Sequence, residues 1–216
     1  MLTLHTAGLL VTGPGSAPVP DGAVLVEGDR IAGLGPYEVL AERHPLARAR
    51  RWPGVLTPGL SVRGAEALLE RTYYPDDPYE TAELGADPVT GAEALDALGL
   101  SEVRWGNSAR RATQKLLSRG VVALSGRLRV PAVRTAVSRS GLALLPAAPD
   151  AADAVPSLDP FAGRAAAAEA FHGSLERGGP ARFAVFDAPD PDALLALGAT
   201  TCVATVIGGR LLHRRR

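Results

Sequence analysis

Apolar residues near the start of the chain fall into short runs whose spacing predicts β-strands. Residues 2–11, LTLHTAGLLV, lead into a continuous apolar stretch, which favours an opening strand. The segments 23–28 and 30–35, AVLVEG and RIAGLG, flank the pair Gly28-Asp29. Two apolar runs on either side of such a pair predict a β-hairpin with a tight turn.

The C-terminal end also contains short apolar runs that predict strands. Residues 181–188, ARFAVFDA, predict a strand, and 190–198, DPDALLALG, predict a brief helix. The last apolar run, TTCVATVIGGRLLHRR, predicts a second hairpin that turns at Gly208-Gly209. Between the first hairpin and the middle of the chain, a short helix over 36–45 and a strand over 51–60 complete a β-rich beginning.

The middle of the chain alternates helical and strand patterns. Residues 105–120 repeat apolar positions at helical spacing, VVALSG follows as a buried strand, 131–141 predict a second helix, and LALLPAA is another apolar run. Alternation of this kind favours parallel strands joined by helical crossovers. We therefore expect an α/β protein with β-rich ends.

Two stretches interrupt this order. Residues 71–96 combine tyrosines, prolines and carboxylates, and we expect an ordered loop without regular elements there. Residues 146–160 predict a polar linker, and 161–171, FAGRAAAAEAF, predict a helix after it.

Composition and charge exclude several classes of function. The 216 residues are 46% hydrophobic without a long apolar run, so we expect a globular protein of the cytoplasm rather than a membrane protein. The 23 basic and 23 acidic residues cancel, which argues against nucleic acid as a partner. Two basic clusters, 43–51 and 213–216, take their charge from arginine, and each contains one histidine. Lys115 is the only lysine of the chain. That bias is typical of a GC-rich bacterial genome. The single Cys202, in an apolar run, predicts a buried, inert strand cysteine.

Several segments carry a resemblance to a known family. They are GAVLVEGDRIAGLGP, VLTPGL, ARRATQKLLSRGVVALSG, GSLERGGPARFAVFD and VATVIGGRLLHRR. Together they resemble the amidohydrolase superfamily, and within it the imidazolonepropionase and aminodeoxyfutalosine deaminase branch. The resemblance implies an α/β fold in which both termini form a composite β-sandwich, here residues 1–56 with 173–216. The insert over 57–172 would be a truncated βα barrel, with room for about three of the eight units that a closed barrel needs.

The residues that would bind metal in this family are replaced. The resemblance implies two histidines after TPGL, where this chain has Gly64 and Glu66. The four histidines, at positions 5, 44, 172 and 213, contain no pair at spacing i, i+2 or i, i+4. We predict that His172 lies at a helix end as a cation rather than as a ligand. No cofactor is predicted.

Two acidic positions and one basic position are weak candidates for a site. Glu66 follows the first barrel-like strand, where α/β proteins present ligands, although it also suits the first turn of a helix over GAEALLER. Asp76 and Asp77 are the other catalytic candidates. Arg63 is a candidate for holding an anionic ligand and is equally consistent with a solvated side chain.

Three tyrosines lie close together in TYYPDDPYE. Tyr73, Tyr74 and Tyr79, beside carboxylates, resemble the composition of small-molecule pockets and partner interfaces. The alternative is that they pack over the barrel remnant and cover it. A Ca²⁺ or Mg²⁺ loop would need more oxygen ligands than this segment offers.

Two hypotheses of function follow. The first is a degenerate, non-catalytic amidohydrolase-like protein that acts as a binding or accessory module. Its open barrel would leave a sheet edge and an apolar surface exposed, and these favour association with another chain. We therefore expect a homodimer or a full-length amidohydrolase-like partner. A small-molecule ligand is a further option. The alternative is a hydrolase or deaminase of non-peptide C–N bonds with an altered site, which would use zinc or iron.

Overall fold

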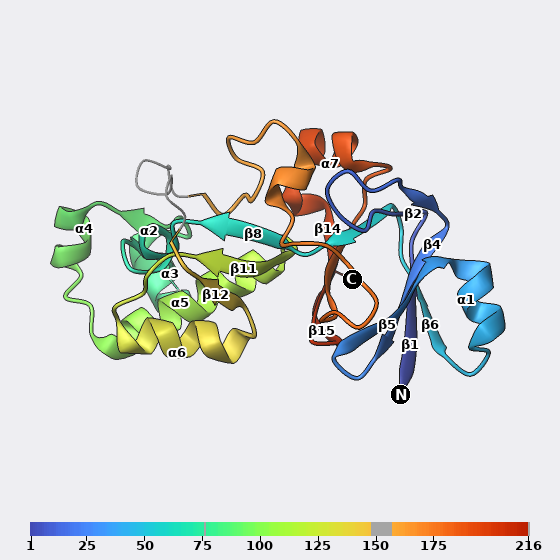
Figure 1. The fold of residues 1–216 in the computed structure, drawn as a ribbon. Helices are drawn as coiled ribbons and strands as arrows, with labels where there is room; N and C mark the ends of the chain where they lie inside the picture. Colours follow the sequence, from blue (N-terminus) through green and yellow to red (C-terminus); the bar gives the residue numbers. More distant parts are fainter. Residues whose placement is uncertain (76, 148–156, 216) are drawn as a thin grey trace. The chain divides into compact units, whose positions relative to one another are not determined.

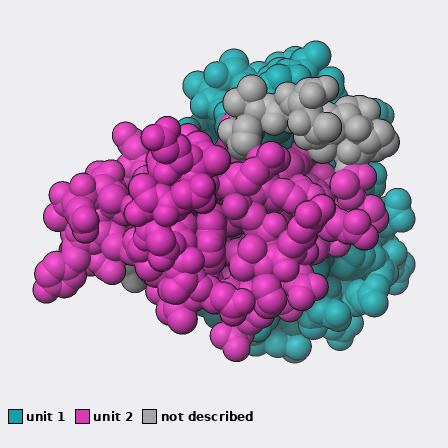
Figure 2. Space-filling model, turned by 90° about the vertical axis from the view of Figure 1, so that its left-hand side faces the viewer, with its two compact units in different colours: residues 1–61, 117–122, 159–216 teal, residues 62–116, 123–158 magenta. Residues whose placement is uncertain are grey.

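The computed structural model describes residues 1–75, 77–147 and 157–215 (Figure 1). The chain divides into two compact units, coloured separately in Figure 2. Unit 1 comprises residues 1–61, 117–122 and 159–216, and unit 2 comprises 62–116 and 123–158. Both ends of the chain therefore belong to one unit, and the chain passes between the units four times.

Unit 1 is built mainly from strands. Its strands are β1 (Leu2–Thr6), β2 (Leu9–Leu10), β3 (Val19–Pro20), β4 (Gly22–Glu27), β5 (Arg30–Pro36), β6 (Arg48–Arg51), β7 (Val55–Pro58), β13 (Arg182–Phe186), β14 (Cys202–Ile207) and β15 (Arg210–Arg214). Its helices are α1 (Tyr37–Arg43), α7 (Pro191–Leu197) and the 3₁₀ helices η2 (Ala167–Ala170) and η3 (Ala199–Thr201).

Two sheets of unit 1 pack as a sandwich. Their strand orders are β5-β4-β1-β6 and β15-β14-β13-β7-β2-β3, and the second sheet joins segments from the two ends of the chain. The core between the sheets combines Val24 and Val26 of β4 with Phe183 of β13 and Val206 of β14. The composite β-sandwich predicted from the resemblance is confirmed.

The continuous apolar run of β4 has a physical reason. Successive side chains of a strand point to opposite faces. Ala23 and Leu25 face away from the sandwich core and pack with Leu4 of β1 and Leu40 of α1. Because α1 covers one face of β4 and the second sheet covers the other, both alternating sets must be apolar.

Both predicted hairpins are confirmed. β4 pairs with β5 around Gly28, whose φ is 60°, and β14 pairs with β15 around Gly208 and Gly209, with φ of 57° and 70°. Tight hairpin turns that match the strand twist require positive φ, which glycine adopts without a steric penalty. Cys202 lies in β14 with 1% exposure, as predicted, and burial raises the pKa of its thiol to about 11.

A histidine is buried in the sandwich core. His5 of β1 is 2% exposed and makes an edge contact with Phe183, with 4.9 Å between the ring centroids. The indole Nε1–H of Trp52 donates a hydrogen bond to His5 Nδ1 over 3.2 Å. Burial, followed by the charge of Arg50, lowers the pKa of His5 to about 4. The imidazole is therefore neutral and accepts at Nδ1.

Unit 2 contains the helices of the βα part. Its elements are α2 (Ala65–Leu69), β9 (Thr72–Tyr73), α3 (Pro78–Leu84), β10 (Val89–Thr90), α4 (Ala92–Ala97), α5 (Glu102–Leu117), α6 (Pro131–Ser140) and β12 (Ala143–Leu145). β8 (Leu60–Arg63) and β11 (Val121–Ser125) each cross from one unit to the other.

The predicted α/β order of the middle of the chain is confirmed. β11 and β12 are parallel and are joined through α6, and the sheet order is β12-β11-β8. Helix α5 buries Ala109, Ala112 and Leu116, which carried the helical spacing in the sequence. Among the described residues no sheet closes into a barrel, which agrees with a truncated barrel.

Two predictions of local structure are wrong. Residues 71–96 contain α3, α4 and the antiparallel pair β9–β10 rather than an irregular loop. Pro78 is the reason for the first error, because proline is well tolerated in the first turn of a helix, where its missing N–H has no partner to lose.

The predicted helix over 161–171 is the second error. Its alanine run forms only the 3₁₀ helix η2, because Leu60 and Phe171 form an extended bridge that ends the segment, and helix propensity is a weak preference that tertiary structure overrides. Most of the predicted linker 146–160 lies outside the described residues, since these stop at 147 and resume at 157.

Membrane insertion through a helix has no support in the described part of the chain. No helix there has both the length and the apolar character needed to cross a bilayer.

Acid should destabilise unit 1 through His5. Its pKa of about 4 in the folded protein is below the ordinary 6.5, so the stabilisation is complete above pH 6.5 and is lost as the pH falls toward 4. The total loss approaches about 3 kcal/mol, at about 1.4 kcal/mol per pKa unit. Urea unfolding across this pH range measures the loss.

Two histidine-to-glutamine variants test whether His5 causes this dependence of stability on pH. His5→Gln retains a hydrogen-bond acceptor for Trp52 but does not titrate, so it should flatten the dependence of stability on pH. His44→Gln makes the same change at the C-terminal end of α1 and should leave the dependence as it is. Equal slopes in the two variants would contradict a role for His5.

Candidate functional site

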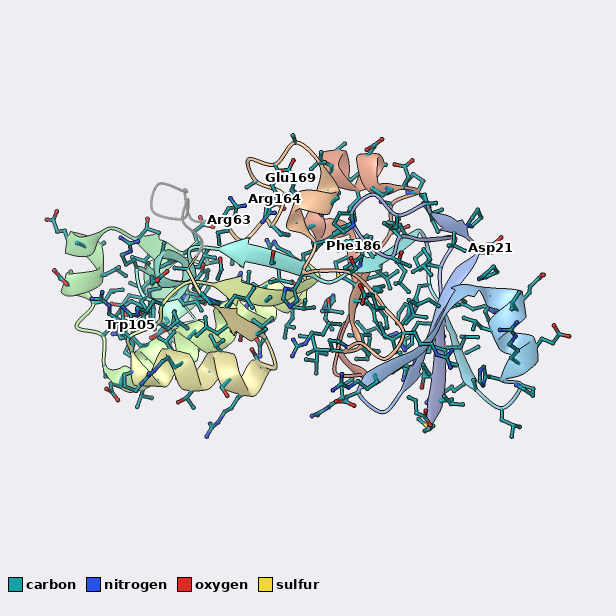
Figure 3. All side chains as sticks on the ribbon, viewed as in Figure 1. Asp21, Arg63, Trp105, Arg164, Glu169 and Phe186 are labelled. Atoms are coloured by element: carbon teal, nitrogen blue, oxygen red, sulfur yellow. The ribbon has the colours of Figure 1, made fainter. Side chains whose placement is uncertain are left out.

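The segment after TPGL contains Gly64 and Glu66, the positions at which the resemblance implies paired histidines. Arg63 ends β8 and its side chain is exposed (Figure 3). Gly64 follows in a left-handed conformation with φ of 73° and begins α2. Glu66 lies in the first turn of α2, so the predicted helix over GAEALLER is confirmed. Neither Gly64 nor Arg63 offers the imidazole nitrogen that zinc binds.

The carboxylate of Glu66 is engaged by the backbone. Its Oε1 accepts a hydrogen bond from the N–H of Arg127, in the loop that follows β11. Gly126 beside it has φ of 152°, and a Cβ there would lie 2.5 Å from Glu66 Oε2. The close approach of the loop to the carboxylate therefore depends on the glycine.

A second carboxylate on the same helix holds the same loop. Glu70 Oε1 accepts hydrogen bonds from the N–H groups of Arg129 and Val130, each over 2.7 Å. Residues four apart lie on one face of a helix, so Glu66 and Glu70 together fasten the loop to α2. Val130 is the N-cap of α6, and the two carboxylates thus place the beginning of the crossover helix.

Asp77 also has a structural contact. Its Oδ1 accepts from the N–H groups of Tyr79 and Glu80, over 2.8 and 2.9 Å, and so caps α3. Asp76, the other predicted acidic candidate, lies outside the described residues.

Tyr73 belongs to a polar network inside unit 2. Its hydroxyl donates to the Glu80 carboxylate over 2.6 Å, and Arg104 Nε lies 3.1 Å from Glu80 Oε1. The Arg104 guanidinium lies 5.3 Å from the centroid of the Tyr73 ring. Burial, followed by the hydrogen bond to Glu80, raises the pKa of Tyr73 to about 12. The phenol therefore remains protonated and acts as a donor.

The packing around Tyr73 explains why the tyrosines do not form one surface. Trp105 of α5 contacts the Tyr73 ring edge-on, with 6.3 Å between the centroids. Tyr74 is buried at 2% exposure and its N–H donates to Ser108 Oγ, whereas Tyr79 is 87% exposed. Two of the three predicted ligand-binding tyrosines thus form part of the core, and the third is on the surface.

Glu80 and Arg104 were missed as partners of Tyr73. The segment TYYPDDPYE contains Glu80, but the sequence gives no signal that Arg104 of α5 contacts it. Ser125 is a further buried polar position. It is the last residue of β11 and is 8% exposed. Its Oγ has no hydrogen-bond partner in the described part of the chain.

Among the described residues, the donor atoms do not converge as a zinc or iron centre requires. All four histidines belong to unit 1, and the sequence of unit 2 contains neither histidine nor cysteine. Across residues 1–75, 77–147 and 157–215, no group of three or more His, Cys, Asp or Glu side chains is positioned to hold a metal ion. Structural and catalytic zinc sites require three or four such ligands.

His172 does not lie at the end of an α-helix, which corrects its predicted place. It follows η2 in an extended segment, and its N–H donates to the carbonyl of Gly59 over 2.8 Å. Burial, followed by the charge of Arg182, lowers the pKa of His172. A lowered pKa opposes the predicted role as a helix-end cation.

Comparison with known proteins agrees with this description. Residues 22–47 match the model of the imidazolonepropionase-like composite domain of bacteria. No curated protein sequence matches the chain. Among solved structures, guanine deaminase of E. coli is similar with a TM-score of 0.61 and 11% identity, with 100% of each chain covered.

Other similar structures cover only part of the chain. Aminofutalosine deaminase of Helicobacter pylori covers 68% of this chain and 33% of its own, with 18% identity and a TM-score of 0.44. An adenosine deaminase from Xanthomonas campestris with bound zinc covers 66% and 33%, with 18% identity and a TM-score of 0.47. The chain spans about a third of the length of these structures.

The composite sandwich, the open βα part and the similarity to guanine deaminase show the fold of the protein. It has an amidohydrolase-type fold. Its sandwich carries an imidazolonepropionase-like composite-domain segment over residues 22–47.

Removing the Glu70 carboxylate should release the loop before α6. Glu70→Ala leaves the N–H groups of Arg129 and Val130 without their acceptor, and we expect a loss of about 1–3 kcal/mol in the free energy of unfolding. Urea unfolding measures this loss, and hydrogen exchange at the two amides should accelerate. Glu83→Ala, which removes an exposed carboxylate from α3, is the matched control. Similar losses in both variants would contradict the anchoring role.

Proposed function

We propose that this protein is a non-catalytic, amidohydrolase-like binding or accessory module. The observation that carries the proposal is the use of Glu66. The carboxylate at the position of a family metal ligand accepts a hydrogen bond from the backbone of the loop after β11. A metal or a water at Glu66 would compete with this hydrogen bond for the orientation of the carboxylate.

The chemistry of the family supplies the second argument. Hydrolytic deamination at neutral pH depends on a metal that lowers the pKa of bound water. Unit 2, which follows the TPGL strand, has no histidine or cysteine in its sequence to hold such an ion. In a site made from Glu66 and Asp77, each carboxylate would also have to serve the loop anchor or the α3 cap that it forms.

A second copy of the chain is the partner that we propose. β12 is the outer strand of its sheet among the described residues, and Leu144 on it is 44% exposed. An open edge with an exposed leucine favours pairing with another strand. A two-fold axis would set β12 against β12 of the partner and bury both leucines. A full-length amidohydrolase-like protein is the alternative occupant of this edge.

Metal content tests the non-catalytic assignment. We expect purified, tag-free protein to hold less than about a tenth of a zinc or iron ion per chain after incubation with metal, because a metal centre needs three or four converging ligands. Elemental analysis before and after chelation measures the content. The melting temperature should not change when metal is added.

The opposite result has a defined meaning. About one tightly held ion per chain, lost together with stability on chelation, would overturn the proposal and favour a metal-dependent hydrolase or deaminase of C–N bonds. Glu66→Gln then identifies the ligand set, because it would lower metal content if Glu66 coordinates the ion.

The association state tests the proposed partner. Light scattering should give twice the 22.3 kDa mass of the chain. Leu144→Lys places a charge at the edge of β12 and should shift the protein toward the monomer. Leu197→Lys changes an exposed leucine of α7 and should leave the dimer intact. A monomer at all concentrations, or a dimer insensitive to Leu144→Lys, would contradict pairing through β12.

A further inference from the structure

Arginines from two edge strands of the sandwich lie on the same side of their sheets as Trp52. We call this group the arginine rim and define it as Arg48, Arg50, Trp52 and Arg214. β6 forms the edge of the first sheet and β15 forms the edge of the second. The rim therefore combines side chains from two edge strands that are far apart in the sequence, and all four residues belong to unit 1.

The register of β6 places two arginines on the core side of its sheet. Parallel pairing sets Arg50 beside His5 and Arg48 beside Thr3. His5 points into the sandwich core, where it contacts Phe183. Because partners in adjacent strands share a face and residues two apart along a strand do as well, Arg48 and Arg50 emerge from β6 on the side of the second sheet.

Arg214 approaches the same point from β15. It pairs with Ala204, which lies in the sandwich core, so its side chain also starts on the inner face. Its guanidinium lies over the Trp52 ring, 5.8 Å from the centroid. Trp52 in turn stacks on His5, with 6.1 Å between the centroids. The indole is thus fixed between a buried histidine and an exposed arginine.

No carboxylate on the surrounding strands neutralises these arginines. The sequences of β1, β6, β13, β14 and β15 contain no Asp or Glu. Asp187, which directly follows β13, is 3.7 Å from the guanidinium of Arg215. Among the described residues, Arg48, Arg50 and Arg214 form no ion pair within 4.0 Å, and like charges held together without a counterion repel.

Arg50 carries an unused donor. Its Nε is buried and has no hydrogen-bond partner among the described residues. Leaving a buried donor unsatisfied is unfavourable, and more so for a charged group. A guanidinium is suited to bind an oxyanion through two parallel N–H groups.

We propose that the arginine rim binds the phosphate group of a small phosphorylated ligand. Arg50 and Arg214 come from different strands and lack a carboxylate counterion. A phosphate monoester carries several oxygens on one centre, so two guanidiniums can bind it together, which favours it over a single carboxylate. The rim lies in unit 1, so the assignment goes beyond the proposed function and does not depend on whether the βα part is catalytic.

Tryptophan fluorescence provides the test, with inorganic phosphate as the probe. The chain has two tryptophans, and Trp105→Phe leaves Trp52 as the reporter. At constant ionic strength, phosphate should change the emission in a saturable way, whereas chloride should not. Calorimetric titration of the unaltered chain gives the same binding constant and covers the case in which Trp105→Phe fails to fold.

Matched variants separate the rim from general screening. Arg50→Gln and Arg214→Gln should each weaken phosphate binding at least about tenfold, as expected for losing a charge-assisted hydrogen bond. Arg177→Gln removes the same charge from an exposed position of unit 1 and should leave binding unchanged. Absence of saturation, or equal losses in all three variants, would overturn the site. Tighter binding of succinate than of phosphate would overturn the assignment to a phosphate ligand.

Discussion

The rest of the structure depends on the pairing of β7 with β13, which joins the two ends of the chain. The antiparallel register sets Val55 against Phe186 and Pro58 against Phe183. β7 also pairs in parallel with β2, so one strand links the beginning and the end of the chain within a single sheet. Gly54 makes this possible. It has φ of 64°, and a Cβ there would lie 2.2 Å from the carbonyl oxygen of Phe186. Only glycine allows the chain to enter β7 so close to the end of β13.

This pairing also decides where the βα part begins. β7 continues through Gly59 into β8, and a Cβ at Gly59 would lie 2.3 Å from Val122. The TPGL segment is therefore required by packing, independently of any chemistry that follows it. After it, Glu66 and Glu70 hold the loop before α6 by accepting hydrogen bonds from its backbone N–H groups. The strand and the loop that faces its end are thus connected through two side chains of the segment that follows TPGL.

The sequence predicted the elements whose signals are local. Glycines with positive φ marked both hairpins, and the spacing of Ala109, Ala112 and Leu116 marked α5, because each signal lies within one element. The errors arose where a distant contact overrides local preference. The alanine run before Phe171 has high helix propensity, yet the bridge from Phe171 to Leu60 ends it in an extended conformation. The same limit applies to the site. Glu66 was a candidate by position, but its acceptance of the Arg127 N–H depends on a loop about sixty residues later.

The arginines show how a compositional bias can conceal a specific arrangement. In the sequence, 43–51 and 213–216 are two basic clusters that an arginine-rich composition explains equally well. The fold separates their members. Arg215 lies near Asp187 and Arg51 contacts Tyr37 on the α1 side, so both have protein partners. Arg214 instead lies over Trp52, which stacks on His5, and Arg50 pairs with His5 in the neighbouring strand. The strands around them carry no acid. Neither cluster alone predicts that Arg50 and Arg214 lie on the inner faces of their sheets. That arrangement follows from the register of β6 and β15. The position of these charges is therefore a property of the composite fold rather than of the composition.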